Sequence, residues 1–201
     1  MTVDDIIDFL EADAASDREH TPDVGIIMGS DSDLDVMAGA HEALDALGFT
    51  EETDADDPPE GYSYETWVVS AHRTPDLMYA YAETAEARGV DVIIAGAGGK
   101  SADLPNMTAS IAFPIPVIGV PVQEKSVDSV IGMPTGAPIT AVDAGKSYNA
   151  ALSAVQILAR ADDALADRLR ELHDDRRAGV ADVSRDLHDQ GVREFRRGRN
   201  D

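Results

Sequence analysis

Residues 24–33 read VGIIMGSDSD, an unbroken apolar run of strand length followed at once by a polar loop. A helical pattern of apolar residues then extends over residues 34–47. An apolar run without polar alternation is typical of a strand that is buried on both faces of a sheet. The stretch therefore predicts one β-loop-α unit, which begins at Val24.

The same unit recurs along the chain. Each of the following apolar runs precedes a helical or irregular segment: TWVVS (66–70), DVIIAGAGG (91–99), PVIGVPV (116–122) and ITAV (139–142). Five such units predict a parallel sheet covered by helices on both sides, because right-handed crossover helices connect parallel strands compactly. The fold class is therefore α/β, a three-layer αβα sandwich. Residues 51–64, rich in Asp, Pro and Gly, are interpreted as a surface insertion.

Segments at both ends lie outside this pattern. Residues 2–14 place Ile6, Ile7 and Leu10 at helical spacing, with Thr2 as a candidate cap, and predict a short accessory helix. Beyond Arg160, apolar residues recur among charges with no further strand, which predicts an amphipathic helix or a pair of helices. The expected organisation is an acidic leader helix at 1–22, a catalytic domain at 23–160 and a helical arm at 161–201, suited to lie on a neighbouring subunit.

Composition excludes several classes of function. The chain has 201 residues and no cysteine, so disulfides, zinc-thiolate sites and cysteine nucleophiles are excluded. It has 16 basic and 39 acidic residues, a net charge of -23 that disfavours nucleic acids and anionic membranes as partners. No run approaches the roughly 18 apolar residues of a membrane span, so we expect a cytoplasmic protein. Heavy acidity with only three lysines indicates a salt-rich cytoplasm.

Polar and glycine-rich loops follow the first three predicted strands, and ligands bind at the carboxyl ends of strands in open parallel sheets. The residues of these loops are Gly29, Ser30, Asp31, Ser32 and Asp33, then Ser70, Ala71, His72, Arg73, Thr74 and Pro75, then Gly96, Ala97, Gly98 and Gly99. Taken singly, each loop is explained by helix capping or a tight turn. Their convergence at one sheet edge instead favours a binding site.

The residue types in these loops suit a small phosphorylated ligand. Backbone amides at helix N-termini, hydroxyls and Arg73 are suited to a phosphate, and Asp33 can accept hydrogen bonds from ribose hydroxyls. His72 has a side chain that both donates and accepts a proton near neutral pH. These features indicate an enzyme or a binding protein for such a ligand, without identifying a reaction.

Six segments, in this order, resemble the N5-carboxyaminoimidazole ribonucleotide mutase family: GSDSD, SAHRTP, IIAGAGG, PVIGVPVQ, VDSVIGMPTGAPI and NAALSAVQIL. The resemblance covers about residues 24–160. It implies a flavodoxin-like sandwich and a homo-octamer with active sites between subunits, needing no metal and no organic cofactor. The implied reaction belongs to purine synthesis: a ribonucleotide substrate loses a carboxyl from its exocyclic nitrogen as carbon dioxide, which the C4 carbon then captures.

The resemblance also assigns roles by motif. His72 matches the histidine that shuttles the proton, and Ser30, Asp33 and Arg73 match substrate-binding positions. The lesser substrate-binding candidates are Ser32, Ser70, Gly96, Ala97, Gly98 and Gly99. The chain departs from the family pattern at KSADLPNM (100–107), where Asp103 lies near the expected place of a second histidine. Whether Lys100 and Asp103 contact substrate stays open.

Two alternatives remain. The first is a carboxylase of the same fold, which fixes free carbon dioxide onto the unmodified aminoimidazole ribonucleotide. Its typical motifs, AHK and AGRSN, differ from the AHR and AGAGG found here, but the altered 100–107 loop keeps it open. The second is a non-catalytic flavin- or nucleotide-binding module, which a flavodoxin-like fold alone would permit. The acids of GSDSD are poorly suited to a flavin phosphate.

Overall fold

The computed structural model describes residues 1–16, 21–54 and 57–198. Its centre is a six-stranded sheet in which all neighbouring strands are parallel. In sheet order the strands are β2 (Thr50–Glu51), β3 (Ser63–Val68), β1 (Val24–Met28), β4 (Val92–Ala97), β5 (Val117–Pro121) and β6 (Thr140–Ala141). Without the two-residue edge strand β2, this is the flavodoxin order. The predicted fold class is confirmed.

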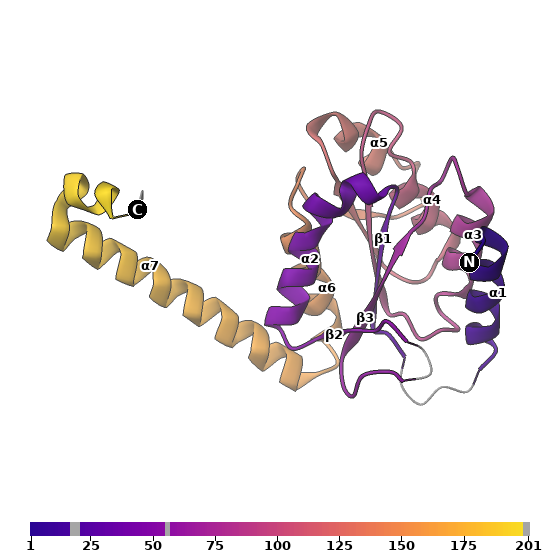
Figure 1. Cartoon of the computed structure of the whole chain (residues 1–201), viewed down its shortest axis with the longest axis horizontal. Coiled ribbons are helices and arrows are strands. Elements are labelled where there is room, and N and C mark those ends of the chain that lie inside the picture. The colour runs from indigo at the N-terminus through magenta and orange to yellow at the C-terminus, as the bar shows by residue number, and fades with distance from the viewer. Residues whose placement is uncertain (17–20, 55–56, 199–201) are drawn as a thin grey trace.

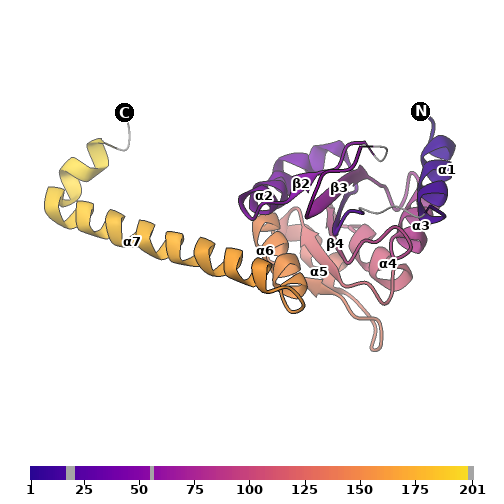
Figure 2. The same ribbon diagram turned by 90° about the horizontal axis from the view of Figure 1, so that it is seen from below.

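Helices cover both faces of the sheet (Figures 1 and 2). One face carries α1 (Val3–Ala14), α3 (Pro75–Thr84) and α4 (Leu104–Ile111), and the other carries α2 (Leu34–Ala46), α6 (Ser147–Leu158) and the start of α7 (Asp163–Arg197). The short helices η1 (Asp31–Asp33), η2 (Glu124–Ser126) and α5 (Val127–Ile131) lie in the connections that follow β1 and β5. The result is the expected three-layer sandwich.

The central strands are apolar throughout because each contributes side chains to two cores. Ile27 and Ile93 pack with α1, α3 and α4, whereas Ile26 and Ile94 pack with α2 and α6. All four side chains are fully buried. The interpretation of residues 24–28 as a strand buried on both faces is therefore confirmed.

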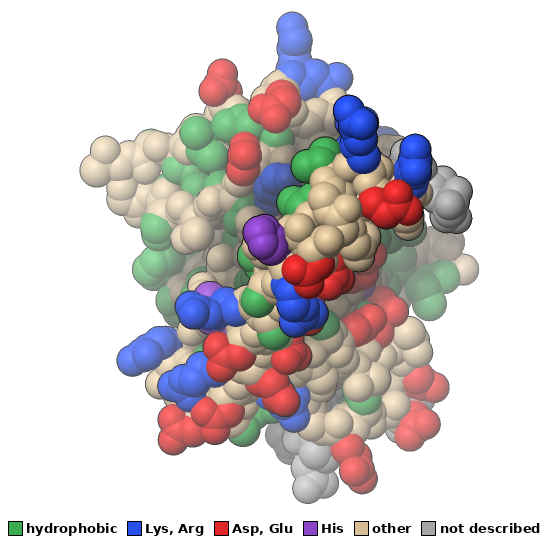
Figure 3. All heavy atoms as spheres, turned by 90° about the vertical axis from the view of Figure 1, so that its left-hand side faces the viewer, with side chains coloured by type: hydrophobic (Ala, Val, Ile, Leu, Met, Phe, Trp, Pro, Cys, Tyr) green, Lys and Arg blue, Asp and Glu red, His purple; other side chains and the backbone are tan. Residues whose placement is uncertain are grey.

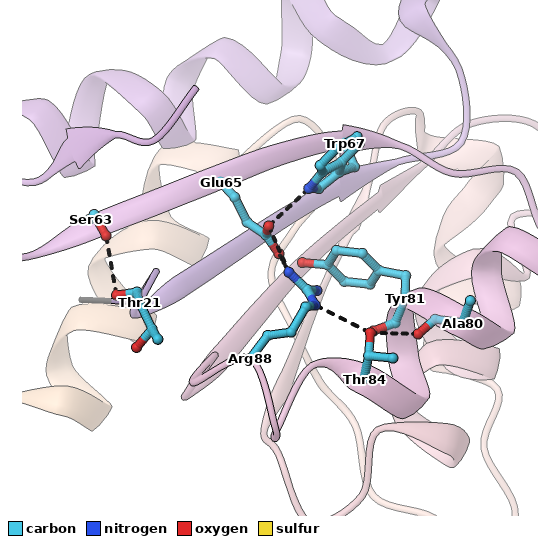
Figure 4. Close-up of polar contacts among 8 residues, drawn as sticks. All are labelled: Thr21, Ser63, Glu65, Trp67, Ala80, Tyr81, Thr84 and Arg88. Carbon is cyan, nitrogen blue, oxygen red and sulfur yellow. Dashed lines mark hydrogen bonds and ion pairs between the residues drawn. The ribbon is translucent and has the colours of Figure 1, made fainter. Parts of the chain in front are cut away.

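The interpretation of residues 51–64 as a surface insertion is wrong at its end. Strand β3 begins at Ser63, and both Ser63 and Tyr64 are buried. The charged residue Glu65 masks the start of this strand, which the apolar run predicted only from residue 66. Its carboxylate accepts hydrogen bonds from Arg88 Nη1 at 2.7 Å and from Trp67 Nε1 at 2.9 Å, so the charge is paired inside the protein (Figure 4).

The predicted accessory helix at the N-terminus is present and packs on the domain. Thr2 caps α1. Its hydroxyl accepts a hydrogen bond from the Asp5 backbone N–H at 3.2 Å, and the Asp5 carboxylate accepts one from the Thr2 backbone N–H. Leu10 is fully buried in the core that α3 and α4 share. Residues 17–20, within the expected leader, lie outside the described part of the chain.

The C-terminal arm leaves the domain and extends away from it (Figures 1 and 2). Helix α7, which makes up 35 residues of this arm, forms two helical pieces, because Gly191 has a non-helical backbone with φ 75° and ψ 156°. Among its residues only Leu165 is buried. Residues 199–201 lie outside the description, and within the described chain no helix is both long and apolar enough to cross a membrane.

Candidate active site

A cavity of about 290 Å³ opens at the carboxyl end of the sheet, around the ends of β1 and β4. The chain leaves β1 toward β3 on one side and continues from β4 toward β5 on the other, so this is the topological switch point of the sheet. The cavity is lined by Gly29, Ser30, Ser32, Asp33, Ser70, Ala71, His72, Ala97, Gly98, Gly99, Ser101, Asp103, Leu104, Gln123 and Lys125. The three predicted loops therefore converge.

Asp33 is buried at the floor of this cavity, with 6% of its surface exposed. A Cβ added at Gly98 would lie 3.1 Å from Asp33 Oδ1, so a glycine there leaves room for the carboxylate. Burial raises the pKa of the Asp33 carboxyl, although the Ser30 backbone and the Arg73 guanidinium act in the opposite direction. Asp33 makes no capping bond to α2, so its carboxylate is not committed to the N-terminus of that helix.

Two of the residues predicted to bind substrate, Gly96 and Arg73, do not line the cavity. Gly96 instead meets helix α2: a Cβ at this position would lie 2.2 Å from Met37 Sδ, so the glycine allows the helix to pack on the sheet. Arg73 lies at the rim. Its Nη2 donates to the Gly29 carbonyl at 2.8 Å, and its backbone N–H donates to Ser70 Oγ at 3.2 Å. Arg73 thus ties the loop after β1 to the loop after β3.

His72 projects from the loop after β3, with 60% of its side chain exposed. Its Nε2 lies 3.3 Å from Asp103 Oδ2 and 3.3 Å from the Ser101 carbonyl oxygen. The second carboxylate oxygen of Asp103 accepts a hydrogen bond from Ser129 Oγ at 2.9 Å. Two acceptors face the same ring nitrogen, an arrangement that favours a proton on Nε2 in a neutral His72.

Sequence reasoning missed Gln123 and Lys125, which line the cavity from the loop after β5. They follow a strand in the same way as the three loops that were considered, so the same rule could have identified them. Lys125 matters most, because it is the basic residue among the described cavity-lining side chains. Lys100 does not line the cavity, whereas Asp103 does.

Among the described residues, no group of three or more Asp, Glu or His side chains is arranged to hold a metal ion. The chemistry available in the cavity is that of an imidazole, two carboxylates, one ammonium group, hydroxyls and backbone amides. This set can bind an anionic, hydroxyl-bearing ligand and move a proton on it.

Residues 23–178 match the family model described as AIR carboxylase. The chain belongs to the AIR carboxylase family. Among curated members, the N5-carboxyaminoimidazole ribonucleotide mutase of Bacillus subtilis is 45% identical over 174 residues, covering 83% of this chain and 98% of that protein. The mutase of Thermotoga maritima is 41% identical over 180 residues, covering 87% of this chain and 96% of that protein.

Two further matches add to this. The chloroplastic phosphoribosylaminoimidazole carboxylase of Vigna aconitifolia is 42% identical over 163 residues, which is 78% of this chain and 27% of the plant protein. The crystal structure of Treponema denticola PurE aligns with a TM-score of 0.68 at 23% identity, covering 82% of this chain and 97% of that one. This structural likeness shows that the chain has the same fold as that protein.

Proposed function

We propose that this protein converts N5-carboxyaminoimidazole ribonucleotide to 4-carboxy-5-aminoimidazole ribonucleotide in purine synthesis, as an isomerase. The observation that carries the proposal is the position of His72. His72 is the one histidine among the described cavity-lining residues, and it belongs to the SAHRTP motif. It lies at the switch point of the sheet, and similar proteins are named as this mutase.

The cavity offers partners for each part of the substrate. Lys125 and the hydroxyls of the serine residues suit the phosphate, as do the backbone amides of the Gly98–Gly99 turn. Asp33, in its ionised form, accepts hydrogen bonds from the ribose hydroxyls. Arg73 holds two cavity loops together and brings a positive charge to the rim.

The reaction needs one proton carrier and an enclosed site. His72 in its protonated form donates a proton to the exocyclic nitrogen as the nitrogen–carboxyl bond breaks, which yields carbon dioxide and the aminoimidazole ribonucleotide. The C4 carbon then attacks the trapped carbon dioxide, and the neutral imidazole of His72 removes the C4 proton. The proton has moved from C4 to nitrogen, the histidine is regenerated, and no redox step occurs.

The second candidate is carboxylation of the unmodified ribonucleotide by free carbon dioxide. Two observations keep it in view: the plant relative is named a carboxylase, and Asp103 stands in the loop where the sequence departs from the mutase pattern. The binding groups and the proton carrier would be the same. Only the origin of the carbon dioxide would differ, so the two reactions are separated by substrate supply.

The test is turnover of N5-carboxyaminoimidazole ribonucleotide, beside the unmodified ribonucleotide plus bicarbonate, by wild type, His72→Asn and Lys125→Gln. We expect wild-type turnover of the first substrate without bicarbonate and a loss of at least about 100-fold in His72→Asn, because a general acid–base group contributes about that much. Lys125→Gln should raise KM with little change in kcat. Activity only with the bicarbonate pair would favour the carboxylase, and no activity on either would contradict both.

We also propose that the protein is cytoplasmic, acts without metal or cofactor, and assembles as a homo-octamer through the arm at 161–201. The assembly is supported by the exposed apolar side chains of α7, a helix that extends away from its own domain (Figure 1). The acidic composition of the whole chain, with a net charge of -23, supports a salt-rich habitat, since salt screens the repulsion among surface carboxylates. Full activity and stability in dilute buffer would contradict the habitat proposal.

A further inference from the structure

We propose that Asp103, held in place by Ser129, is a positioning residue that orients His72 and fixes its proton on Nε2. The catalytic consequence rests on the proposed function, whereas the orientation of the ring does not. Asp103 belongs to none of the six segments that carry the family resemblance, and it lies where the sequence departs from the family pattern. Ser129 lies in one of those segments, VDSVIGMPTGAPI, but the sequence alone assigned it no role.

Three separate elements meet at this contact. His72 comes from the loop after β3, Asp103 directly precedes α4, and Ser129 lies in α5. Asp103 occupies the N-cap position of α4, yet its side chain makes no capping bond to that helix. Its two oxygens are instead divided between neighbours, with Oδ2 at 3.3 Å from His72 Nε2 and Oδ1 at 2.9 Å from Ser129 Oγ.

The Ser129 bond gives the carboxylate a fixed direction. A serine hydroxyl beside an ionised carboxylate must donate its proton, so Oδ1 is occupied and Oδ2 faces the imidazole. The Ser101 carbonyl faces the same nitrogen at 3.3 Å. Both partners favour a proton on Nε2, and Nδ1 is therefore the nitrogen that keeps a lone pair for proton exchange with substrate.

The orientation matters because His72 is otherwise held weakly. Its side chain is 60% exposed on a loop, so the ring would sample several rotamers without a partner. A carboxylate that accepts from one ring nitrogen selects both the tautomer and the direction of the other nitrogen. Removing the charge while keeping the shape of Asp103 should therefore change proton transfer more than substrate binding.

The first measurement is the tautomer of His72 in the ligand-free protein labelled with 15N-histidine. Two-bond 1H–15N correlations distinguish Nδ1–H from Nε2–H, and the His72→Asn variant identifies the resonance. In wild type we expect Nε2–H. In Asp103→Asn, the Ser129 hydroxyl retains Oδ1 and turns the amide group toward His72, so the population should shift toward Nδ1–H. Asp35→Asn, an exposed carboxyl on α2, is the matched control and should leave the signal unchanged.

The second measurement is steady-state kinetics on N5-carboxyaminoimidazole ribonucleotide. Asp103→Asn should lower kcat by about tenfold or more while KM stays within about twofold, and Ser129→Ala should show a smaller loss of kcat. An unchanged tautomer in Asp103→Asn overturns the inference, as does a change in KM alone. If wild type does not turn over this substrate, the proposed function fails, and the tautomer measurement still decides whether Asp103 positions His72.

Discussion

Asp33, the residue proposed to bind the ribose hydroxyls, carries a cost to stability. The carboxyl is buried at the cavity floor, and burial raises its pKa because a charge is poorly solvated there. A group whose pKa is raised on folding stabilises the folded state most at low pH. That contribution is lost as the pH rises from the ordinary value of 3.8 through the raised one. At neutral pH the ionised carboxylate therefore lowers the stability of the folded protein.

Replacing Asp33 by Asn should therefore separate stability from binding. At pH 7 we expect Asp33→Asn to unfold at a higher urea concentration than wild type, with the difference shrinking as the pH falls through the raised pKa. KM for the ribonucleotide should rise about tenfold or more, since a hydrogen bond to a charged acceptor contributes about 1.5–3 kcal/mol. Equal unfolding midpoints at pH 7, measured by circular dichroism, would show that the buried charge carries no such cost.

The residues of the site were predictable to the extent that their position after a strand determines their role. Ser30, Asp33 and His72 follow predicted strands, and the sheet brings them to one cavity as expected. Lys125 follows β5, whose apolar run leads into a loop without the glycines, the Ser-Asp pattern or the His-Arg pair of the first three, so it lacked their signal. The contact between His72 and Asp103 could not be predicted from spacing, because it depends on how α4 and α5 pack after the sheet has formed.

At the scale of elements, pairing of charges conceals the start of strand β3 in the sequence. Glu65 faces the core, where Arg88 has a fully buried side chain 2.7 Å from the carboxylate and lies over the Tyr81 ring (Figure 4). A charged residue inside a strand counts against a buried strand when its partner is unknown. The partner lies 23 residues away, so apolar periodicity alone placed the start of β3 too late.

Gly96 was predicted to bind substrate because it follows a strand, but its glycine serves the packing of α2 on β4. This contact yields a prediction about stability. Because a Cβ at this position would lie 2.2 Å from Met37 Sδ, and Met37 is fully buried, Gly96→Ala should destabilise the protein by about 1–3 kcal/mol. KM should stay unchanged, since Gly96 does not line the cavity. The measurement is urea unfolding together with steady-state kinetics.

The matched control is Gly179→Ala in the exposed part of α7, where an added Cβ meets no atom within 4 Å. Alanine is favoured over glycine in helices by about 0.5–1 kcal/mol, so this variant should lose no stability. A raised KM in Gly96→Ala with an unchanged unfolding midpoint would instead return Gly96 to the binding residues.

For the whole molecule, charge is divided unevenly between domain and arm. Helix α7, residues 163–197 of the arm, carries 9 acidic and 8 basic side chains and is nearly neutral, whereas the whole chain has a net charge of -23. Viewed from the side of the free end of α7, acidic and basic groups are intermixed with apolar patches between them (Figure 3). A nearly neutral arm with half of the chain's basic residues is repelled less by the acidic domain of a second copy than another domain would be.

The proposed role of the arm in assembly rests on an apolar stripe beyond the first turns of α7. Val180, Val183 and Leu187 lie at helical spacing and are 70%, 50% and 37% exposed. Since fully burying such side chains contributes about 1.5–3 kcal/mol each, replacing all three by Ser should weaken the assembly. Sedimentation velocity should then show a smaller particle at the same protein concentration.

The control pair Asp182→Ser and Arg185→Ser removes an exposed ion pair from the same helix and should leave the particle size unchanged. An assembly of wild-type size in the triple variant would mean that the subunits associate through the domain at 23–160, and the arm would need another role.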